Sequence, residues 1–480
     1  MSGRRPFYKP ALALLIALLL AVVGFVQGQL NRQRAALGLT RVTPLENAPP
    51  MLAFTTVALG GFRGLISNAL WIRANELQND GKYFEIVQLA DWITKLEPTF
   101  DQVWKFQAWN MAYNISVKFS DPADRWRWVK RGIELIRDEG LRYNPHETLL
   151  YHELAWHYQH KLGQNLDDAH RYYKEQWARE MEAALGSSRT NLAELVNPQT
   201  PELQRQAETL KTQYKLDPKI MKEVDDQYGP LEWRLPEAHA IYWAVVGLKN
   251  TSAEKQNASD LRTLRRVVYQ SMHQSVLHGR ITSMEPFRFG PDLTKVESAS
   301  DAFEKMIAIE NEIPDAFRGA HRNFLREVVY QLFVNGQRRE AERWLTKLKE
   351  QYPGAVPPGM TAEHLALARL QLSEINSMGH DRVKAVVEGM LRNYYLNFAL
   401  DDDELAGGME YLARSVYSNY STNINRAAVS LPPYAEMKQE VLDSFLDPQS
   451  GLDPRVPARL RTKLGLPAAT NAAPTAPSNP

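Results

Sequence analysis

Residues 71–98, WIRANELQNDGKYFEIVQLADWITKLEP, constrain the fold more than any other part of the chain. Apolar residues recur there at intervals of three and four, first around Ala74 and again after Gly81, as on one face of each of two helices. Gly81 favours a break between these helices, and Pro98 favours the end of the second. The spacing therefore predicts two helices that fold back on each other.

The same pattern recurs far downstream, where Gly336 and Pro353 are separated by the same interval as Gly81 and Pro98. Apolar residues again flank the turn, at Val329, Leu332, Ala341, Leu345 and Leu348. Weaker copies lie between the two, around Trp104, Ala108 and Met111 and around Tyr151, Leu154 and Ala155. Such recurrence indicates a repeat protein, in which each helix pair buries the apolar face of its neighbour.

These motifs resemble the tetratricopeptide repeat, in which a small residue lets two helices approach, a glycine makes the turn and a proline ends the unit. The resemblance is to a bacterial, membrane-anchored protein of this family. It implies an all-α solenoid of helix-turn-helix units that binds other proteins or peptides as a scaffold or adaptor, and that is not an enzyme. The chain shows no alternating pattern of apolar and polar residues, so we expect no strands.

Residues 10–31 carry no charged side chain, and their centre, residues 11–26, is apolar. This length is close to the ~20 residues that cross a bilayer. More basic residues precede the segment than follow it, which favours a cytoplasmic N-terminus over residues 1–9. We therefore expect a single-pass transmembrane anchor in the bacterial inner membrane, with the bulk of the chain in the periplasm. Cleavage as a signal peptide remains the alternative.

Shifts in composition predict the domain organisation of the remaining chain. The expected segments are a tether over 32–60, an N-terminal repeat block over 61–185, a polar insertion or linker over 186–235, a C-terminal helical block over 236–446, and a disordered tail rich in Pro and Ala over 447–480.

Charge and cysteine content exclude several classes of function. Lys plus Arg number 57 against 56 Asp plus Glu, so no overall positive field draws the chain to nucleic acid. Cysteine is absent, which excludes disulfides, thiolate nucleophiles and cysteine-ligated metals.

A stack of helix pairs forms a concave surface, which the first helix of each pair lines. Polar residues on these helices are the candidates for contact with a partner. They are Arg73, Asn75, Gln107, Asn110, Asn114, His157 and Gln159.

Residues 146–160, HETLLYHELAWHYQH, are rich in histidine. Zinc binding by a His-Glu-x-x-His motif requires two histidines four residues apart on one helix face. His152 and His157 are five apart, so their side chains diverge, and we expect neither a metal nor a cofactor. Two alternatives to the scaffold stay open: a metal-dependent enzyme that uses residues 146–160, and a structural component of envelope assembly or secretion machinery.

Overall fold

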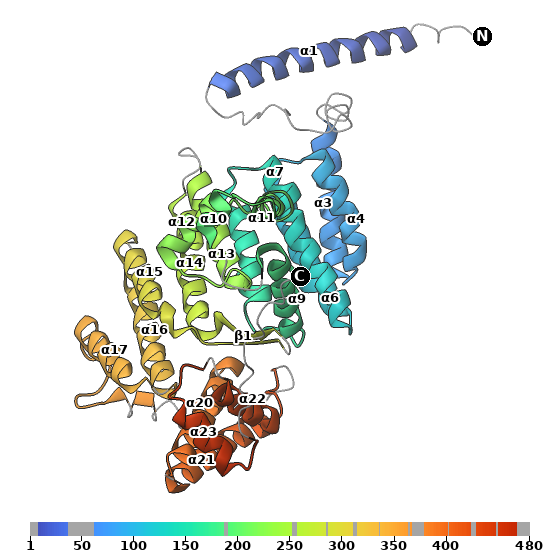
Figure 1. Ribbon diagram of the computed structural model, residues 1–480. Coiled ribbons are helices and arrows are strands. Elements are labelled where there is room, and N and C mark those ends of the chain that lie inside the picture. Colours follow the sequence, from blue (N-terminus) through green and yellow to red (C-terminus); the bar gives the residue numbers. More distant parts are fainter. Residues whose placement is uncertain are drawn as a thin grey trace. The chain divides into compact units, whose positions relative to one another are not determined.

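The computed structural model describes most of the chain and divides it into two compact units, Met1–Ile66 and Ser67–Pro480. The described residues are 8–36, 62–186, 191–251, 257–284, 287–310, 314–335, 337–362, 365–366, 379–401, 403–423, 429–447 and 450–467. These residues are mostly helical, which confirms the all-α prediction (Figure 1).

Helix α1, Tyr8–Ala36, contains the apolar segment near the N-terminus. Among the described residues, no helix is both long enough and apolar enough to span a bilayer. The predicted anchor over 10–31 is therefore wrong, and so is the placement in a bacterial inner membrane with a periplasmic body.

The first predicted helix pair is confirmed as α3, Phe62–Asn79, and α4, Tyr83–Leu96. Ala74 and Ile86 are buried where the two helices meet. Gly81 has a φ of +72°, in the left-handed region that glycine adopts without strain. The turn therefore depends on this glycine.

The second predicted pair is confirmed as α16, Pro314–Val334, and α17, Arg338–Gln351, which pack against each other. The predicted core positions, Val329, Leu332, Ala341, Leu345 and Leu348, are all buried. Gly336, the predicted turn residue, lies outside the described residues.

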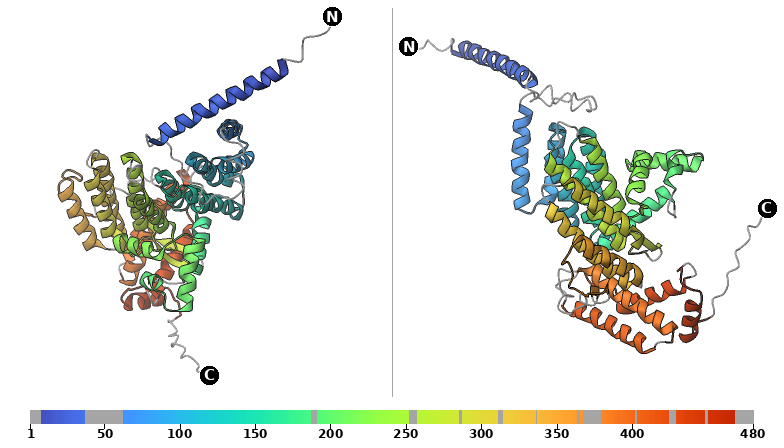
Figure 2. Two further views of the ribbon diagram at one scale, coloured as in Figure 1. Left: turned by 90° about the horizontal axis from the view of Figure 1, so that it is seen from above. Right: turned by 90° about the vertical axis from the view of Figure 1, so that its left-hand side faces the viewer.

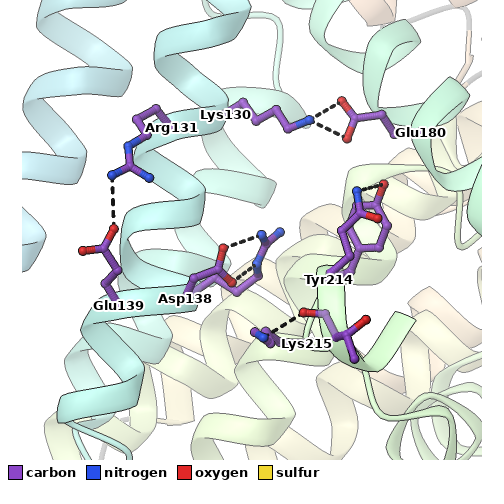
Figure 3. Close-up of polar contacts among 10 residues, drawn as sticks. Lys130, Arg131, Asp138, Glu139, Glu180, Tyr214 and Lys215 are labelled. Carbon is purple, nitrogen blue, oxygen red and sulfur yellow. Dashed lines mark hydrogen bonds and ion pairs between the residues drawn. The ribbon is translucent and has the colours of Figure 1, made fainter. Parts of the chain in front are cut away.

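Between these pairs, three helices continue without a break into π-helical segments. The α-helices are α5, Asp101–Trp109; α6, Pro122–Glu134; α7, Leu141–Tyr143; α8, Thr148–Trp156; and α9, His170–Leu185. The π-helical segments are Asn110–Ile115, Leu135–Gly140 and His157–Leu162, and a 3₁₀ turn covers Ser116–Lys118. Lys130 of α6 donates to both carboxylate oxygens of Glu180 on α9, each at 2.9 Å, and so joins neighbouring helices (Figure 3).

The stretch predicted to be a polar insertion or linker forms three helices over its described part. These are α10, Leu192–Val196; α11, Pro201–Gln213; and α12, Pro218–Tyr228. Thr200 and Asp217 accept hydrogen bonds from first-turn amides, and a proline follows each, which is a strong helix start. Leu195, Leu210 and Met221 lie in the largest core cluster. The domain boundaries themselves stay a prediction.

Helices α13, Pro236–Asn250, and α14, Ala258–His278, follow, and a short antiparallel hairpin comes after them. The strands are β1, Arg280–Met284, and β2, Phe287–Gly290, paired from Arg280 opposite Gly290 to Met284 opposite Phe287. The expectation of no strands is wrong at this hairpin, which is too short for an alternating pattern to show in the sequence.

The C-terminal helices form a core cluster of their own beside α16 (Figure 1). These helices are α20, His380–Ala399; α21, Asp403–Asn423; α22, Tyr434–Leu446; and α23, Arg455–Lys463. Between the hairpin and α16 lie a 3₁₀ turn, Leu293–Lys295, and α15, Val296–Ile309. Leu460 of α23 is fully buried. The prediction of a disordered tail from 447 is therefore wrong for α23; residues 468–480 lie outside the described residues.

From α13 to α17, each helix packs on the next one in the chain. Helix α13 packs on α8 and α14, α14 on α15, α15 on α16, and α16 on α17 and α20 (Figure 2). Gly247 of α13 allows the close approach to α8, because a Cβ there would lie 2.6 Å from Cβ of Tyr151.

Candidate functional site

A cavity of about 480 Å³ lies among the end of α14, the middle of α16, the start of α20 and the loop before α9. We call it the histidine cavity. Its polar lining consists of Gln164, Asn165, His273, Gln274, His278, Glu327, Gln331, His380, Asp381, Arg382 and Tyr420. These residues are far apart in the sequence and meet only in the folded chain.

The ends of two helices position the histidines of this cavity. Helix α14 ends after His278 at Gly279, where a Cβ would lie 2.3 Å from the Ser275 carbonyl oxygen, so only glycine fits. Helix α20 begins at His380, after the extended residue Gly379. A helix C-terminus thus brings His278, and a helix N-terminus brings His380, to the same cavity.

Each of these histidines lies beside a carboxylate. His278 Nδ1 is 2.9 Å from Oε1 of Glu237, and both side chains are buried. His380 Nδ1 is 3.2 Å from Oδ1 of Asp381. Burial would raise the pKa of Asp381, but the hydrogen bond from His380 and the nearby charges of His278 and Lys174 outweigh it, so that the pKa falls below its usual value. Asp381 is therefore ionised.

A buried lysine lies behind this cavity. Lys174 is 1% exposed, and its Nζ is 3.4 Å from Oδ1 of Asn165 and 3.4 Å from Nδ1 of His170. Burial lowers the pKa of Lys174, against the attraction of Asp381 and Glu237. Burial, together with the charge of Lys174, lowers the pKa of His170 to about 2, so this histidine is neutral at pH 7.

Several buried polar atoms of the lining have no hydrogen-bond partner among the described residues. They include Oε1 of Gln331, Oε1 of Gln274 and Nε of Arg382. Gln331 is 2% exposed, and its amide nitrogen donates to Glu327 Oε1 at 3.0 Å, which leaves its oxygen unpaired. Buried polar groups are nearly always hydrogen-bonded to protein or to ordered water, so these atoms are exceptions that contacts among the described residues do not explain.

The lining can bind polar groups and can also move protons. Glu327 and Asp381 are balanced in part by Arg382, whose Nη2 lies 3.5 Å from Glu327 Oε2, so the cavity does not select for strong charge of either sign. The pairs His278–Glu237 and His380–Asp381 have the composition of proton-transfer groups. No serine or threonine hydroxyl, however, belongs to the described lining.

The structure disperses the seven residues predicted to contact a partner, and none of them lines the histidine cavity. Arg73 is exposed and pairs with Glu76 at 3.0 Å. Asn75 is also exposed and donates to the Trp71 carbonyl. Contact of these two side chains with a partner stays a prediction.

Four of the seven are buried and satisfy backbone groups inside the protein. Gln107 donates to the Val87 carbonyl, and Asn110 donates to the Tyr83 carbonyl. Gln159 donates to the Val267 carbonyl and to Ser271. His157 Nδ1 lies 2.8 Å from the Glu153 carbonyl oxygen. The remaining residue, Asn114, donates to Oδ1 of Asn110. Gln107, Asn110 and Gln159 thus pair with neighbouring helices, which the sequence alone does not distinguish from a lined groove.

Two histidines of segment 146–160 stack on the tryptophan between them. Trp156 stacks on His152 and on His160, with ring centres 6.1 and 4.3 Å apart. The Tyr113 hydroxyl lies 3.1 Å from Nδ1 of His160. Burial lowers the pKa of His152 and of His160 to about 4. Within the described part of the chain, no three His, Asp or Glu side chains converge as metal ligands.

Comparison with known proteins gives no match: no family model, no curated protein and no solved structure matches this chain. The resemblance to the tetratricopeptide repeat therefore stays a prediction, and the site must be interpreted from its own geometry.

Sequence analysis missed the histidine cavity. Its histidines are isolated in the sequence, at positions 273, 278 and 380, and no spacing rule connects them. The one local signal is Gly379 followed by His380 and Asp381, which has the composition of a helix start. Such a signal locates the start of a helix, but it does not identify the side chains that this helix start meets in the folded chain.

Proposed function

We propose that this protein is a non-enzymatic helical-repeat protein, a solenoid of tetratricopeptide-like units, that binds a polypeptide partner through the histidine cavity. The packing of α13 on α14, α14 on α15, α15 on α16 and α16 on α17 supports the repeat architecture. In repeat proteins, stacked units commonly form binding surfaces.

The single observation that carries the binding proposal is the set of unpaired buried atoms in this cavity. Gln331 and Gln274 each offer an acceptor, and Arg382 offers a donor. A peptide group has one N–H donor and one C=O acceptor, and a side-chain amide has both as well. A polypeptide segment can therefore donate to the two glutamine oxygens and accept from Arg382 without adding net charge.

Selection of peptides from a random displayed library on the purified protein tests this proposal. We expect an enriched consensus whose affinity, measured by fluorescence anisotropy, falls at least about tenfold in Gln331→Ala and in Arg382→Ala, because each variant removes a buried hydrogen bond. Arg339→Ala changes the charge of an exposed residue on α17, away from the cavity, and should bind as the wild type does.

Circular dichroism and thermal unfolding establish that each variant is folded. Arg382 also pairs with Glu327, so Gln331→Ala is the decisive variant if Arg382→Ala is unstable. The proposal fails if no peptide is enriched, or if the enriched peptides bind Gln331→Ala as tightly as the wild type.

A further inference from the structure

A second cavity, of about 570 Å³, lies between α15, α16 and the turn after α17. We call it the arginine cavity, since Arg318 and Arg322 line it from α16. Residues four apart on a helix share a face, so the two guanidinium groups project to the same side. Arg326, one turn further along, donates from its guanidinium to the Ala355 carbonyl at the rim of this cavity.

The positive charge on this helix face is only weakly compensated. Arg318 has one carboxylate neighbour, Asp315, at 3.7 Å, and the side chain of Asp315 is 96% exposed, so this pair contributes little. Arg322 has no ion-pair partner among the residues that the structure describes. Burial and the charge of Arg322 both lower the pKa of Arg326. Three adjacent guanidinium groups without matching carboxylates repel one another, and a bound anion would relieve the repulsion.

The one carboxylate in the lining does not neutralise these arginines, because other groups occupy it. Glu304 Oε1 accepts hydrogen bonds from Ser300 at 3.2 Å and Gln351 at 3.1 Å, and it lies 3.1 Å from Nζ of Lys347. The positive charge of Lys347 thus offsets Glu304. The cavity retains the charge of its arginines.

A neutral histidine, His321, also lines the cavity, on the same helix as the two arginines. Burial lowers the pKa of His321 to about 4, so its ring is uncharged at pH 7. The ring lies between Ser300 Oγ, 3.1 Å from its Nε2, and the Tyr352 hydroxyl, 2.8 Å from its Nδ1. An anion that enters the cavity therefore meets the guanidinium groups of Arg318 and Arg322 and the Tyr352 hydroxyl, and His321 adds no charge.

We propose that the arginine cavity binds a dianionic phosphate group, as inorganic phosphate or as a small phosphate monoester. Guanidinium groups donate in a planar fork that matches phosphate oxygens, and two forks on one helix face can share a single tetrahedral anion. The charge of a phosphate dianion matches that of Arg318 and Arg322 together. This site is independent of the histidine cavity and of the polypeptide that we propose binds there.

Isothermal titration of the full-length protein with inorganic phosphate, at constant ionic strength, tests the proposal. We expect saturable binding with a Kd below about 1 mM, weakened at least about tenfold by Arg322→Ala. Arg339→Ala removes one exposed positive charge from α17 and is the matched control, which should bind phosphate as the wild type does. A parallel titration with phosphoserine distinguishes the two sources, since tighter binding of phosphoserine identifies a monoester.

Two results would overturn this assignment. One is the absence of saturable phosphate binding by the wild type. The other is equal weakening in Arg322→Ala and Arg339→Ala, which would show that phosphate responds only to overall charge. If Arg322→Ala does not fold, Arg318→Ala takes its place, because the side chain of Arg318 is 57% exposed and contributes little to packing.

Discussion

Helices α13 and α16 contain similar residues in different surroundings. Each has a proline in its first turn, a glycine and a buried histidine. Every residue of α13 from Pro236 to Gly247 is buried, so neighbouring helices cover all of its faces. Helix α16 buries residues such as Phe324 and Val328, but it exposes Arg318 and Arg322.

Because α13 is covered on all faces, it contributes to stability, whereas the exposed face of α16 can form binding sites. Helix α13 has no free face and no room for a ligand. Helix α16 lines both cavities, the arginine cavity with Arg318, His321 and Arg322 and the histidine cavity with Glu327 and Gln331. A helix can therefore line a site only where its neighbours leave a face uncovered.

The largest effect that we expect comes from the glycine of α13. Gly247→Ala places a Cβ 2.6 Å from Cβ of Tyr151 and 2.9 Å from Leu264, and the first of these atoms cannot move without the backbone of α8. Overpacking of this kind lowers the free energy of unfolding by ~1–3 kcal/mol. Urea denaturation followed by circular dichroism measures the change, and a loss below ~0.5 kcal/mol would mean that α8 and α13 are not closely packed.

A second prediction concerns the histidine of α13. His239 is fully buried, its Nε2–H donates to the Trp233 carbonyl at 2.8 Å, and burial lowers its pKa to about 4. In the unfolded chain the histidine binds a proton near pH 6.5, whereas in the folded protein it does so only near pH 4. The contribution of neutral His239 to the free energy of unfolding is therefore fully present above pH 6.5 and is lost as the pH falls toward 4. From pH 7 to pH 5 the contribution of His239 is a loss of about 2 kcal/mol.

The comparison with His239→Gln isolates this contribution, since other buried histidines also titrate. We expect the wild type to lose about 2 kcal/mol more unfolding free energy than the variant when the pH falls from 7 to 5. A difference that stays constant over this range would show that water reaches His239.

The smallest effect is expected for the glycine of α16, and it should have the opposite sign. A Cβ at Gly319 meets no atom within 4 Å, and this glycine lies inside a helix. Because alanine favours a helix interior by up to ~1 kcal/mol over glycine, Gly319→Ala should raise the free energy of unfolding slightly. Thermal unfolding is a sufficient measurement, and destabilisation would indicate that a further segment covers this face of α16.

Sequence analysis predicted the helix pairs well, because their apolar spacing and turn residues are local signals. Ala74, Gly81 and Ile86 occupy the predicted places in the first pair. The helices around Pro201 and Pro218 were missed despite their capping residues, because their polar composition suggested a linker.

The candidate site depended on contacts that are not local. Gln107, Asn110 and Gln159 are polar residues on first helices, as a groove would require, yet each pairs with a backbone carbonyl of another helix. Gln331 and His380 meet in one cavity only because α16 packs against α20. Periodicity identifies which residues share a helix face, but it does not identify which helix that face meets.

The central claim is that the helices stack as pairs whose stability depends mainly on their nearest neighbours, and hydrogen exchange of Ala74→Leu tests it most directly. Ala74 is 1% exposed between α3 and α4, so a leucine there overpacks the first pair. In a repeat array the damage stays local, and residues 62–115 should lose protection while α16 and α17 keep theirs. A uniform loss of protection along the described helices would mean that they form one cooperative globule, which would contradict the repeat architecture.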